Sequence, residues 1–331
     1  MKQIKVTLLY PPHQSWPDSM CKPNGSLAYP NLAGALLEMG VEVNIYDACV
    51  GNSQDDLKEI FYQSTELDSG LMRTGVSDQR ILEQVSDANL VGLTSIFSDQ
   101  ETMVLNCTNL IKKTFPEKLI VAGGVNARSR KQKFFQNGVD IICLSEAERT
   151  IQKIVGTLQG NSKNFSSISA IAYNNDGQIK INPPNPNEIV WNLDELPMPA
   201  WHLLPNERYW EIGRPHGGHF DSNDELHYAS MTTSMGCVFA CKFCHIAGET
   251  EDGDSGPIGR FRIKSDERVM AELEELQKLG VKQVFLEDDS LFGKKKRMIQ
   301  LLKKIRGYGF DILDVNGVNI VHLLRKQYPD I

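Results

Sequence analysis

Short apolar runs of strand length alternate with patterns of helical period along the first half of the chain. The apolar runs predict strands at 4–10, 41–46, 90–94, 119–122 and 140–144. Helical periodicity predicts helices at about 32–40, 99–115, 128–137 and 146–159. Because strands alternate with helices, we expect a mainly parallel α/β sheet with both faces covered, and ligands bound beyond the carboxyl ends of its strands.

Three loops follow these predicted strands and therefore lie where a ligand would bind, at 11–30, 95–99 and 123–127. Gly123 and Gly124 come directly after a strand, and a glycine pair lets the backbone approach a ligand closely. The same pair is also common in plain turns. The chain has no G-x-G-x-x-G motif, so a standard dinucleotide site has little support.

The second half begins with a connector and then returns to the alternating pattern. A hairpin with an Asn-Asn-Asp-Gly turn is predicted at 168–181, followed by a proline-rich stretch up to Trp201, which we expect to anchor against a domain. Beyond it, strands are predicted at 226–232, 281–287 and 310–316, with helices at 266–279, 294–306 and from about 319. Ser265 and Gly280 bracket the first of these helices as its caps. In such βα repeats, active groups lie at the carboxyl ends of the strands.

Composition limits the classes of function. The hydrophobic share of 41% and the charged share of 23% are typical of a soluble globular protein, and no apolar stretch is long enough to span a bilayer. A net charge of −7 argues against a dedicated nucleic-acid surface, which needs a basic face. Four cysteines fall outside any motif, and the amino terminus does not resemble a signal peptide, so we expect a reducing, cytoplasmic setting.

The remaining three cysteines, Cys237, Cys241 and Cys244, have the spacing C-x-x-x-C-x-x-C. Three thiolates on one loop can hold three irons of a cubic cluster and leave the fourth iron open for a ligand. A structural zinc site would need a fourth ligand, and His245 is awkwardly adjacent to Cys244. The C-x-x-C-H substring of haem attachment and a disulfide pairing both belong to exported proteins. The iron–sulfur interpretation is therefore favoured.

This spacing matches the signature of the radical SAM enzymes completely. The resemblance implies a [4Fe-4S] cluster held by the three cysteines, with S-adenosylmethionine on the open iron. Phe243 matches the aromatic residue that packs near the adenine in that family. The run from Phe285 to Asp289 resembles the family segment that contacts the amino group of S-adenosylmethionine, which implies Glu287, with Asp288 as its neighbour. A solvated acidic strand end is the alternative.

The first half resembles the cobalamin-binding domain that precedes many radical SAM cores, through 32–43, 91–95, 121–125 and 139–148. The resemblance implies that Ser95, Gly123 and Gly124 face the corrin and its nucleotide tail. It departs from the family pattern at 26–29 and at Ser145. The chain has no D-x-H-x-x-G motif, so histidine ligation of cobalt through that motif is not expected. A bare flavodoxin-like domain that binds nothing is the alternative.

The segment 193–201 resembles the linker between the two domains of cobalamin-dependent radical SAM proteins. We therefore expect a cobalamin-binding domain at 1–160, a hairpin and proline-rich linker at 161–225, and half of a radical SAM (β/α) barrel at 226–331. The fold class is α/β, with a flavodoxin/Rossmann-like sheet followed by this partial barrel. Because the second half has fewer strands than a full barrel, the chain is interpreted as truncated.

The resemblance implies an enzyme that cleaves S-adenosylmethionine reductively and uses cobalamin, most often to methylate an unactivated substrate centre. A radical oxidative cyclase or rearrangement enzyme with the same cofactors is the alternative. A noncatalytic cobalamin- or cluster-binding protein is a further one. The expected partners are a small-molecule substrate and an electron donor such as flavodoxin or ferredoxin, without nucleic acid or membrane.

Overall fold

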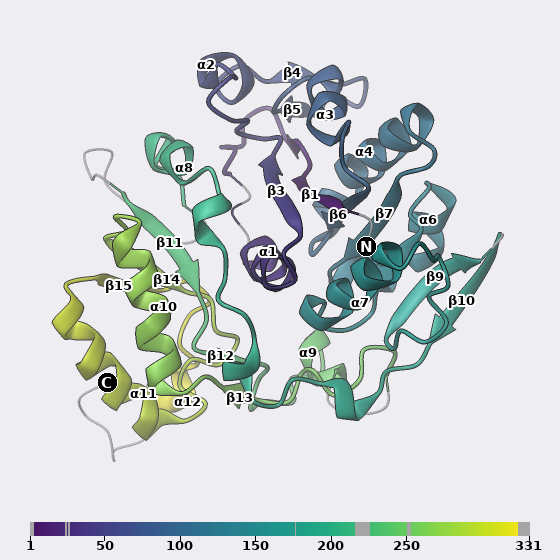
Figure 1. Ribbon diagram of the computed structural model, residues 1–331. Coiled ribbons are helices and arrows are strands. Elements are labelled where there is room, and N and C mark those ends of the chain that lie inside the picture. Colours follow the sequence, from purple (N-terminus) through teal and green to yellow (C-terminus); the bar gives the residue numbers. More distant parts are fainter. Residues whose placement is uncertain are drawn as a thin grey trace. The chain divides into compact units, whose positions relative to one another are not determined.

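The computed structural model in Figure 1 describes residues 3–23, 25, 27–175, 177–215, 226–249 and 253–323. Contacts divide the chain into two compact units. Unit 1 comprises Met1–Glu188, Pro197–Tyr209 and Asp254–Gly256, and unit 2 comprises Ile189–Leu196, Trp210–Gly253 and Pro257–Ile331. Part of the predicted linker, 216–225, and the continuation of the last predicted helix beyond 323 lie outside the described residues. The domain boundaries expected from the sequence stay a prediction.

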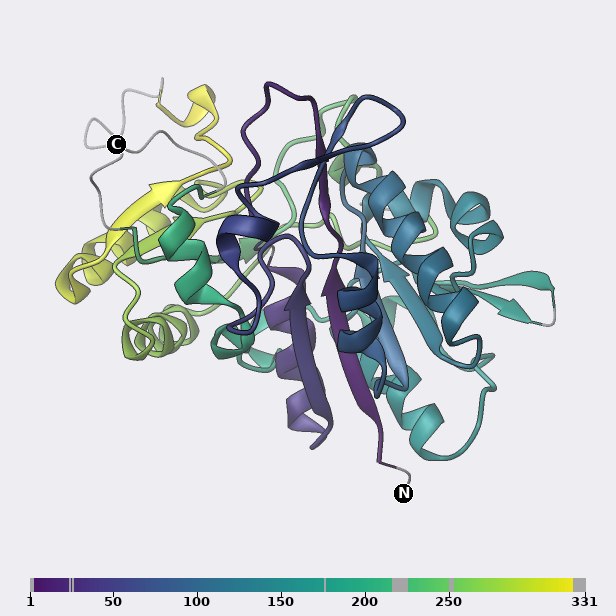
Figure 2. The same ribbon diagram turned by 90° about the horizontal axis from the view of Figure 1, so that it is seen from above.

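Unit 1 is built on a seven-stranded sheet with the order β10-β9-β8-β7-β6-β1-β3 (Figure 2). Its strands are β1 (Lys5–Tyr10), β3 (Glu42–Asp47), β6 (Leu90–Thr94), β7 (Leu119–Gly123), β8 (Ile141–Cys143), β9 (Ile171–Asn175) and β10 (Gln178–Asn182). The neighbours among β3, β1, β6, β7 and β8 pair in parallel. The predicted parallel α/β sheet is therefore confirmed, and β6 has the predicted bounds.

Helices cover both faces of this sheet because its parallel strands are apolar on both sides. The helices are α1 (Ala28–Glu38), α3 (Asp78–Val85), α4 (Glu101–Thr114), α5 (Val125–Ser129), α6 (Lys131–Gln136) and α7 (Glu148–Gln159), besides the single turn α2 (Leu57–Ile60). One core cluster joins α1 and α7 to the sheet, and the other joins α3, α4 and α6 to it. All five residues of β6 are buried, as expected of a central strand.

The helix boundaries follow local chemistry, with one correction. Helix α1 ends at Glu38, and Gly40 adopts the left-handed conformation with a φ of 68°. The amide of Val41 then donates to the carbonyl of Leu36, as in a Schellman cap. The single helix predicted at 128–137 is wrong, because the backbone leaves helical geometry at Arg130 and separates α5 from α6.

The predicted hairpin forms as β9 and β10. Strand β9 pairs antiparallel with β8, with Ile141 opposite Tyr173 and Cys143 opposite Ile171. The hairpin thus extends the sheet of unit 1 beyond its parallel part. A second, three-stranded sheet of β2 (His13–Ser15), β5 (Met72–Thr74) and β4 (Thr65–Glu66) was not anticipated from the sequence. Its strands are too short to show a clear alternation.

The segment Pro197–Tyr209 packs back onto unit 1 and continues into α8 (Asn206–Ile212). The amide of Ala200 donates to the carbonyl of Pro30 over 2.8 Å, and Trp201 is buried. Trp201 is therefore an anchor, as predicted. The close approach has a sequence cause, because a side chain at Gly34 would place its Cβ 2.1 Å from the carbonyl oxygen of Met198.

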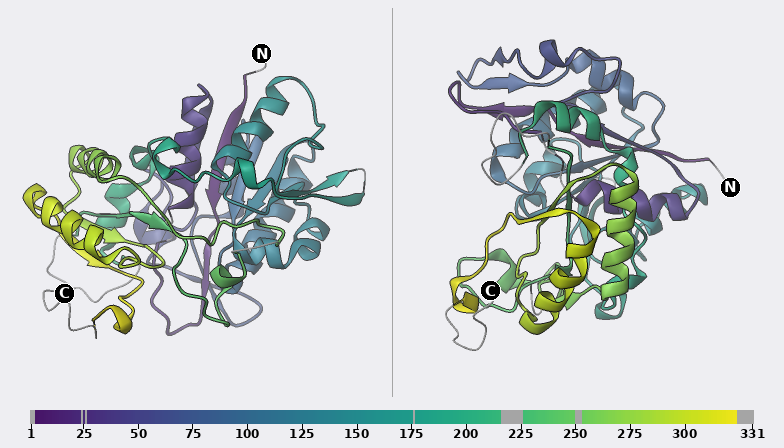
Figure 3. Two further views of the ribbon diagram at one scale, coloured as in Figure 1. Left: turned by 90° about the horizontal axis from the view of Figure 1, so that it is seen from below. Right: turned by 90° about the vertical axis from the view of Figure 1, so that its left-hand side faces the viewer.

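Unit 2 contains a parallel three-stranded sheet with the order β11-β14-β15. Its elements are β11 (Tyr228–Met231), β12 (Ser234–Met235), α9 (His245–Gly248), β13 (Arg262–Ile263), α10 (Asp266–Lys278), β14 (Gln283–Leu286), α11 (Lys295–Ile305), β15 (Asp311–Asp314) and α12 (Ile320–Leu323). Helices α10 and α11 lie on one face of the sheet (Figure 3), as right-handed crossovers require. The predicted βα repeat is confirmed, and the described strands close no barrel.

Helix α10 has the caps that the sequence predicts. The hydroxyl of Ser265 accepts a hydrogen bond from the amide of Arg268, and Gly280 follows the helix with a φ of 86°. Its inner face also contains a buried carboxylate, that of Glu272, which pairs with Lys264 over 2.6 Å and with Arg268 over 2.7 Å. Within the described part of the chain, no helix is long and apolar enough to cross a bilayer.

The contact at Gly34 generates a stability prediction. Gly34→Ala should destabilise unit 1 by about 1–3 kcal/mol, because the new methyl group overlaps the backbone of Met198. Gly156→Ala is the matched control, since this helical glycine on α7 has space for a Cβ and should gain about 0.5–1 kcal/mol. Denaturant unfolding followed by circular dichroism measures both changes. Equal stability of the two variants would contradict the prediction.

Candidate functional site

The strand order of unit 1 creates a switch point between β1 and β6. In sequence order the parallel strands are arranged 2-1-3-4-5, which is the flavodoxin-like arrangement. The connections leave β1 and β6 in opposite directions, so the loops after these two strands diverge at the carboxyl edge. Ligands in open α/β sheets bind in the crevice that this divergence leaves.

A cavity of about 190 Å³ lies at this edge, between the sheet and the helices α1 and α7. Its lining includes Gly92 and Thr94 of β6, Gly123 and Gly124 after β7, and Leu32 of α1. Apolar atoms dominate this lining. The cavity is too small for a complete corrin.

The two glycines after β7 have different roles. Gly124 has a φ of 95°, and a Cβ there would lie 2.4 Å from the carbonyl oxygen of Ser95. A Cβ at Gly123 would meet no atom within 4 Å, so this residue leaves open space at the cavity wall. Gly124 is needed for the turn, whereas Gly123 keeps the cavity open.

Ser95 is fully buried and is held by its neighbours. Its hydroxyl accepts from the side-chain amide of Asn126 over 2.9 Å, and its carbonyl accepts from the amide of the same residue. The amide of Ser95 donates to the carbonyl of Gly123, which ties the loops after β6 and β7 together. Its neighbours Thr94 and Ile96 line the cavity. Contact between Ser95 and a corrin stays a prediction.

Tyr29 bridges the switch point and was missed as a site residue in the sequence. It lies in the first turn of α1, is 1% exposed and lines the cavity. Its hydroxyl donates to the carbonyl of Leu9 over 2.6 Å and lies 3.2 Å from the carbonyl of Gly92. Burial raises the pKa of Tyr29 well above its ordinary value, so the hydroxyl stays protonated and can donate. One side chain thus connects α1 to β1 and β6.

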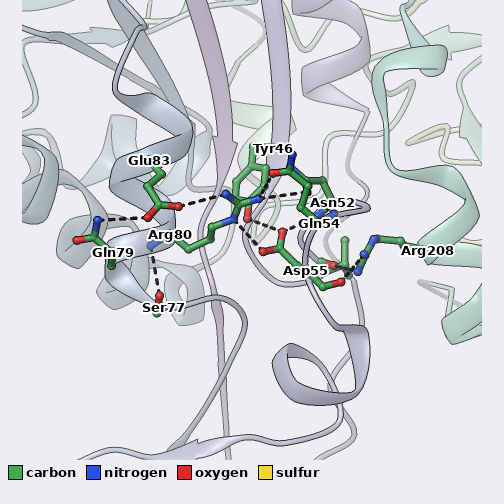
Figure 4. Close-up of polar contacts among 10 residues, drawn as sticks. Tyr46, Asn52, Gln54, Asp55, Ser77, Gln79, Arg80, Glu83 and Arg208 are labelled. Carbon is green, nitrogen blue, oxygen red and sulfur yellow. Dashed lines mark hydrogen bonds and ion pairs between the residues drawn. The ribbon is translucent and has the colours of Figure 1, made fainter.

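The loop after β3 is fixed by an ion pair (Figure 4). The carboxylate of Asp55 pairs with Arg80 of α3 over 2.8 Å and accepts from the hydroxyl of Tyr46 and the amide of Asn52. Burial and the charge of Asp55 raise the pKa of Tyr46, so its hydroxyl donates. Arg208 donates to the carbonyls of Val50 and Asp55.

The three-cysteine loop in unit 2 follows β12. Strand β12 pairs antiparallel with β13, and the amide of Cys237 donates to the carbonyl of Gly259 over 3.0 Å. Gly236 has a φ of 74°, and a Cβ there would lie 2.5 Å from the carbonyl oxygen of Arg260. These contacts fix the start of the loop. Just ahead of α9, the backbone amide of Cys244 donates to the carbonyl of Cys241.

The thiols of Cys237, Cys241 and Cys244 are free and partly exposed on this one loop. Among the described residues, no three His, Cys, Asp or Glu side chains are gathered closely enough to hold a metal ion. The donor set itself, three accessible thiols, suits an iron–sulfur cluster. Phe243 is 94% exposed, so its packing against an adenine stays a prediction.

The acidic residues after β14 divide into distinct environments. Asp288 is buried, and its carboxylate accepts from the amide and hydroxyl of Thr233 and from the hydroxyl of Ser234. Burial raises the pKa of Asp288, although these donors oppose the shift. Asp288 therefore connects the ends of β11 and β14. Glu287 is half-buried, and its amide donates to the carbonyl of Met231.

Asp289 faces the cysteine loop. The backbone amide of Gly236 hydrogen-bonds to its carboxylate, and His245 is near enough to lower its pKa. Burial of the carboxylate away from water has a larger effect than His245. Together with the charge of Asp288, it raises the pKa of Asp289 to about 6. The residue as a whole is nevertheless exposed at the surface. The family resemblance implies Glu287 and Asp288 and assigns no role to Asp289.

The chain has sequence relatives among curated proteins, although no protein-family model matches it. It is 28% identical over 232 residues to an uncharacterized methyltransferase of Pyrococcus horikoshii, covering 68% of this chain and 45% of that protein. It is 25% identical over 333 residues to cytidylyl-2-hydroxyethylphosphonate methyltransferase of Streptomyces wedmorensis, covering 92% and 58%. It is 23% identical over 199 residues to the cobalamin-dependent radical SAM methyltransferase TokK of Streptomyces tokunonensis, covering 60% and 27%.

Two solved structures share the fold. The radical S-adenosylmethionine methyltransferase TsrM of Kitasatospora setae aligns with a TM-score of 0.60 at 15% identity, over 92% of this chain and 51% of that one. The cobalamin-dependent S-adenosylmethionine radical enzyme OxsB, with aqua-cobalamin bound, aligns with a TM-score of 0.60 at 17% identity, over 88% and 35%. Cobalamin-dependent radical SAM enzymes are thus among the proteins to which the chain is similar in sequence and in fold. It spans about half the length of the curated relatives it matches first.

The buried carboxylate of Asp288 generates a second prediction. Asp288→Ala should destabilise unit 2 by about 1–3 kcal/mol, because it leaves the buried donors of Thr233 and Ser234 without an acceptor. Asp311→Ala, at an exposed position on β15, should stay within about 0.5 kcal/mol of the parent protein. Thermal unfolding of both variants measures the difference, and unchanged stability of Asp288→Ala would refute the assignment.

Proposed function

We propose that this protein is a cobalamin-dependent radical SAM enzyme that methylates an unactivated centre of a small-molecule substrate. The observation that carries the proposal is the cysteine loop of Cys237, Cys241 and Cys244 at the carboxyl end of a parallel βα sheet. A second unit with a 2-1-3-4-5 sheet and a cavity at its carboxyl edge supports the cobalamin part. The sequence relatives, which are methyltransferases by name, support methyl transfer.

The three thiols would hold a [4Fe-4S] cluster, drawn together from the partly exposed positions that they now occupy. The loop enters this region from a fixed start at Gly236, so its later residues are the part that has to adapt. When bound, the cluster supplies an electron to S-adenosylmethionine, and cobalamin carries a methyl group. The protein's own contribution is to bind and orient these groups.

The contacts to S-adenosylmethionine are proposed at the rim around this loop. Glu287 at the end of β14 would accept from its ammonium group, and Phe243 would pack near its adenine. Asp288 would act through Thr233 and Ser234, whose positions it fixes, more than by direct contact. A charged acceptor such as Glu287 makes hydrogen bonds to an ammonium group strong.

The cobalamin site is proposed at the switch point of unit 1. The cavity beside Gly123 and Gly124 would take the nucleotide tail, while the corrin would lie outside the carboxyl edge near the loop of Ser95. No D-x-H-x-x-G motif is present, so the cobalt would have no histidine ligand from that motif. An electron donor such as flavodoxin or ferredoxin completes the proposed set of partners.

A radical cyclisation or rearrangement with the same cofactors is the second candidate. It is supported by the structural neighbour OxsB, a cobalamin-dependent S-adenosylmethionine radical enzyme. Formation of 5′-deoxyadenosine from S-adenosylmethionine under anaerobic reducing conditions tests for a radical SAM enzyme of either kind. Transfer of a labelled methyl group to a product then distinguishes methylation from cyclisation.

The cluster proposal predicts the metal content of variants. Anaerobically reconstituted protein should contain a [4Fe-4S] cluster, and replacing any one of Cys237, Cys241 and Cys244 by alanine should abolish it, because each thiolate is a ligand. Iron and sulfide analysis with electron paramagnetic resonance measures the cluster. Cys143→Ala is the control, since this core cysteine is buried in β8, and it should keep its iron. Stoichiometric zinc in place of iron would refute the proposal.

The cobalamin proposal predicts the effect of filling the cavity. Gly123→Leu should weaken hydroxocobalamin binding roughly ten- to hundredfold, because overpacking a close-fitting site costs about 1–3 kcal/mol. Gly156→Leu makes the same change on the exposed surface of α7 and should bind normally. Binding is measured by the corrin absorbance retained after gel filtration. Equal retention by the two variants would contradict the assignment of the tail to this cavity.

A further inference from the structure

Two cysteines outside the cluster loop lie side by side in unit 1. The Sγ atoms of Cys21 and Cys49 are 3.7 Å apart, although the residues are separated by 28 positions in the sequence. Cys21 belongs to the long loop between β2 and α1, and Cys49 follows β3. Cys107 and Cys143, the other cysteines of this unit, are buried among apolar residues in separate core clusters.

We propose that Cys21 and Cys49 form a reversible disulfide bond that ties the loop before α1 to the loop after β3. A disulfide bond is about 2.05 Å long, so the two sulfur atoms have to approach by about 1.7 Å from their present 3.7 Å. The proposal goes beyond the proposed function and does not depend on it.

The backbone around Cys49 is held by several hydrogen bonds. The amide of Cys49 donates to the carboxylate of Asp47 over 2.9 Å, and the same carboxylate accepts from the hydroxyl of Tyr209. The carbonyl of Ala48 accepts from the amide of Val76. Hydrogen bonds on both sides of Cys49 therefore hold its backbone in place.

The accessibility of the two thiols differs and sets the order of the chemistry. Cys21 is 8% exposed, whereas Cys49 is fully buried. A hydrogen bond with Cys21 and burial raise the pKa of Cys49 well above its ordinary value, so this thiol stays protonated in the resting protein. An oxidant arriving from solvent therefore meets Cys21 first.

The reaction balances with a peroxide as the oxidant. The thiol of Cys21 gives up its proton, and its sulfur attacks one peroxide oxygen. The O–O bond breaks and the departing hydroxide takes up that proton, so that a sulfenic acid and water are formed. The sulfur of Cys49 then attacks the sulfenic sulfur, the S–S bond forms, and a second water leaves with the proton of Cys49. The two thiols are oxidised and the peroxide is reduced. A thiol reductant restores the pair by exchange.

The bond would constrain a wall of the candidate cofactor site. The loop that contains Cys21 runs directly into α1, whose residues Ala28, Tyr29 and Leu32 line the cavity. A crosslink between residues 28 positions apart also restricts the unfolded chain, which raises stability. Oxidation should therefore raise the unfolding temperature of unit 1 and should do so only when both cysteines are present.

Peptide mapping tests the proposal on the whole 331-residue chain. Reduced protein is treated anaerobically with hydrogen peroxide, remaining thiols are alkylated after denaturation, and the peptides are identified by mass spectrometry. The expected result is a linked peptide pair joining Cys21 to Cys49, lost in Cys21→Ser and in Cys49→Ser and kept in Cys107→Ser. Dithiothreitol should release the pair.

Two other results would overturn the proposal. One is alkylation of Cys21 and Cys49 to the same extent as Cys107 after oxidation. The other is Cys21 linked to a cysteine of the cluster loop instead of Cys49.

The unfolding temperature is the second readout. Folding of the serine variants is checked by circular dichroism. Oxidation should raise the unfolding temperature of the parent protein but not that of Cys49→Ser. An equal rise in both proteins would also refute the disulfide.

Discussion

The structure of unit 1 depends on the need to bury both faces of a parallel sheet. Parallel strands need crossover helices, and right-handed crossovers place those helices on one face or the other according to the direction in which the chain moves along the sheet. The direction reverses once, between β1 and β6. That reversal separates α1 and α7 from α3 and α4, and the cavity lies at the carboxyl edge, between the sheet and the helices α1 and α7.

A close backbone contact at a glycine and a hydrogen bond from a buried hydroxyl fix the conformation of this carboxyl edge. Gly124 turns under the carbonyl of Ser95, and Tyr29 donates across the strands that flank the reversal. Behind β3, Asp55 and Arg80 connect the loop to α3. Each contact joins segments far apart in the sequence, so tertiary contacts fix the conformation of the edge.

In unit 2, contacts between distant segments likewise hold the strand ends of a smaller sheet in place. Asp288 connects the ends of β11 and β14, and the pairing of β12 with β13 fixes the entry to the cysteine loop. The loop that contains the three thiols therefore begins at a fixed strand end, and the thiols themselves are partly exposed. This arrangement suits a cofactor that gathers its ligands as it binds.

Features that depend on local pattern could be predicted from the sequence. Strand β6, the caps of α10 and the spacing of the cysteines are set within a few residues of each other, because burial, capping and ligand spacing are short-range properties. The contacts between distant groups became visible only in the folded structure. The acceptors of the Tyr29 hydroxyl, the internal role of Asp288 and the contact of Cys21 with Cys49 join segments that no periodicity connects. Such contacts arise when the sheet order brings loops together, and strand order is a property of the whole chain.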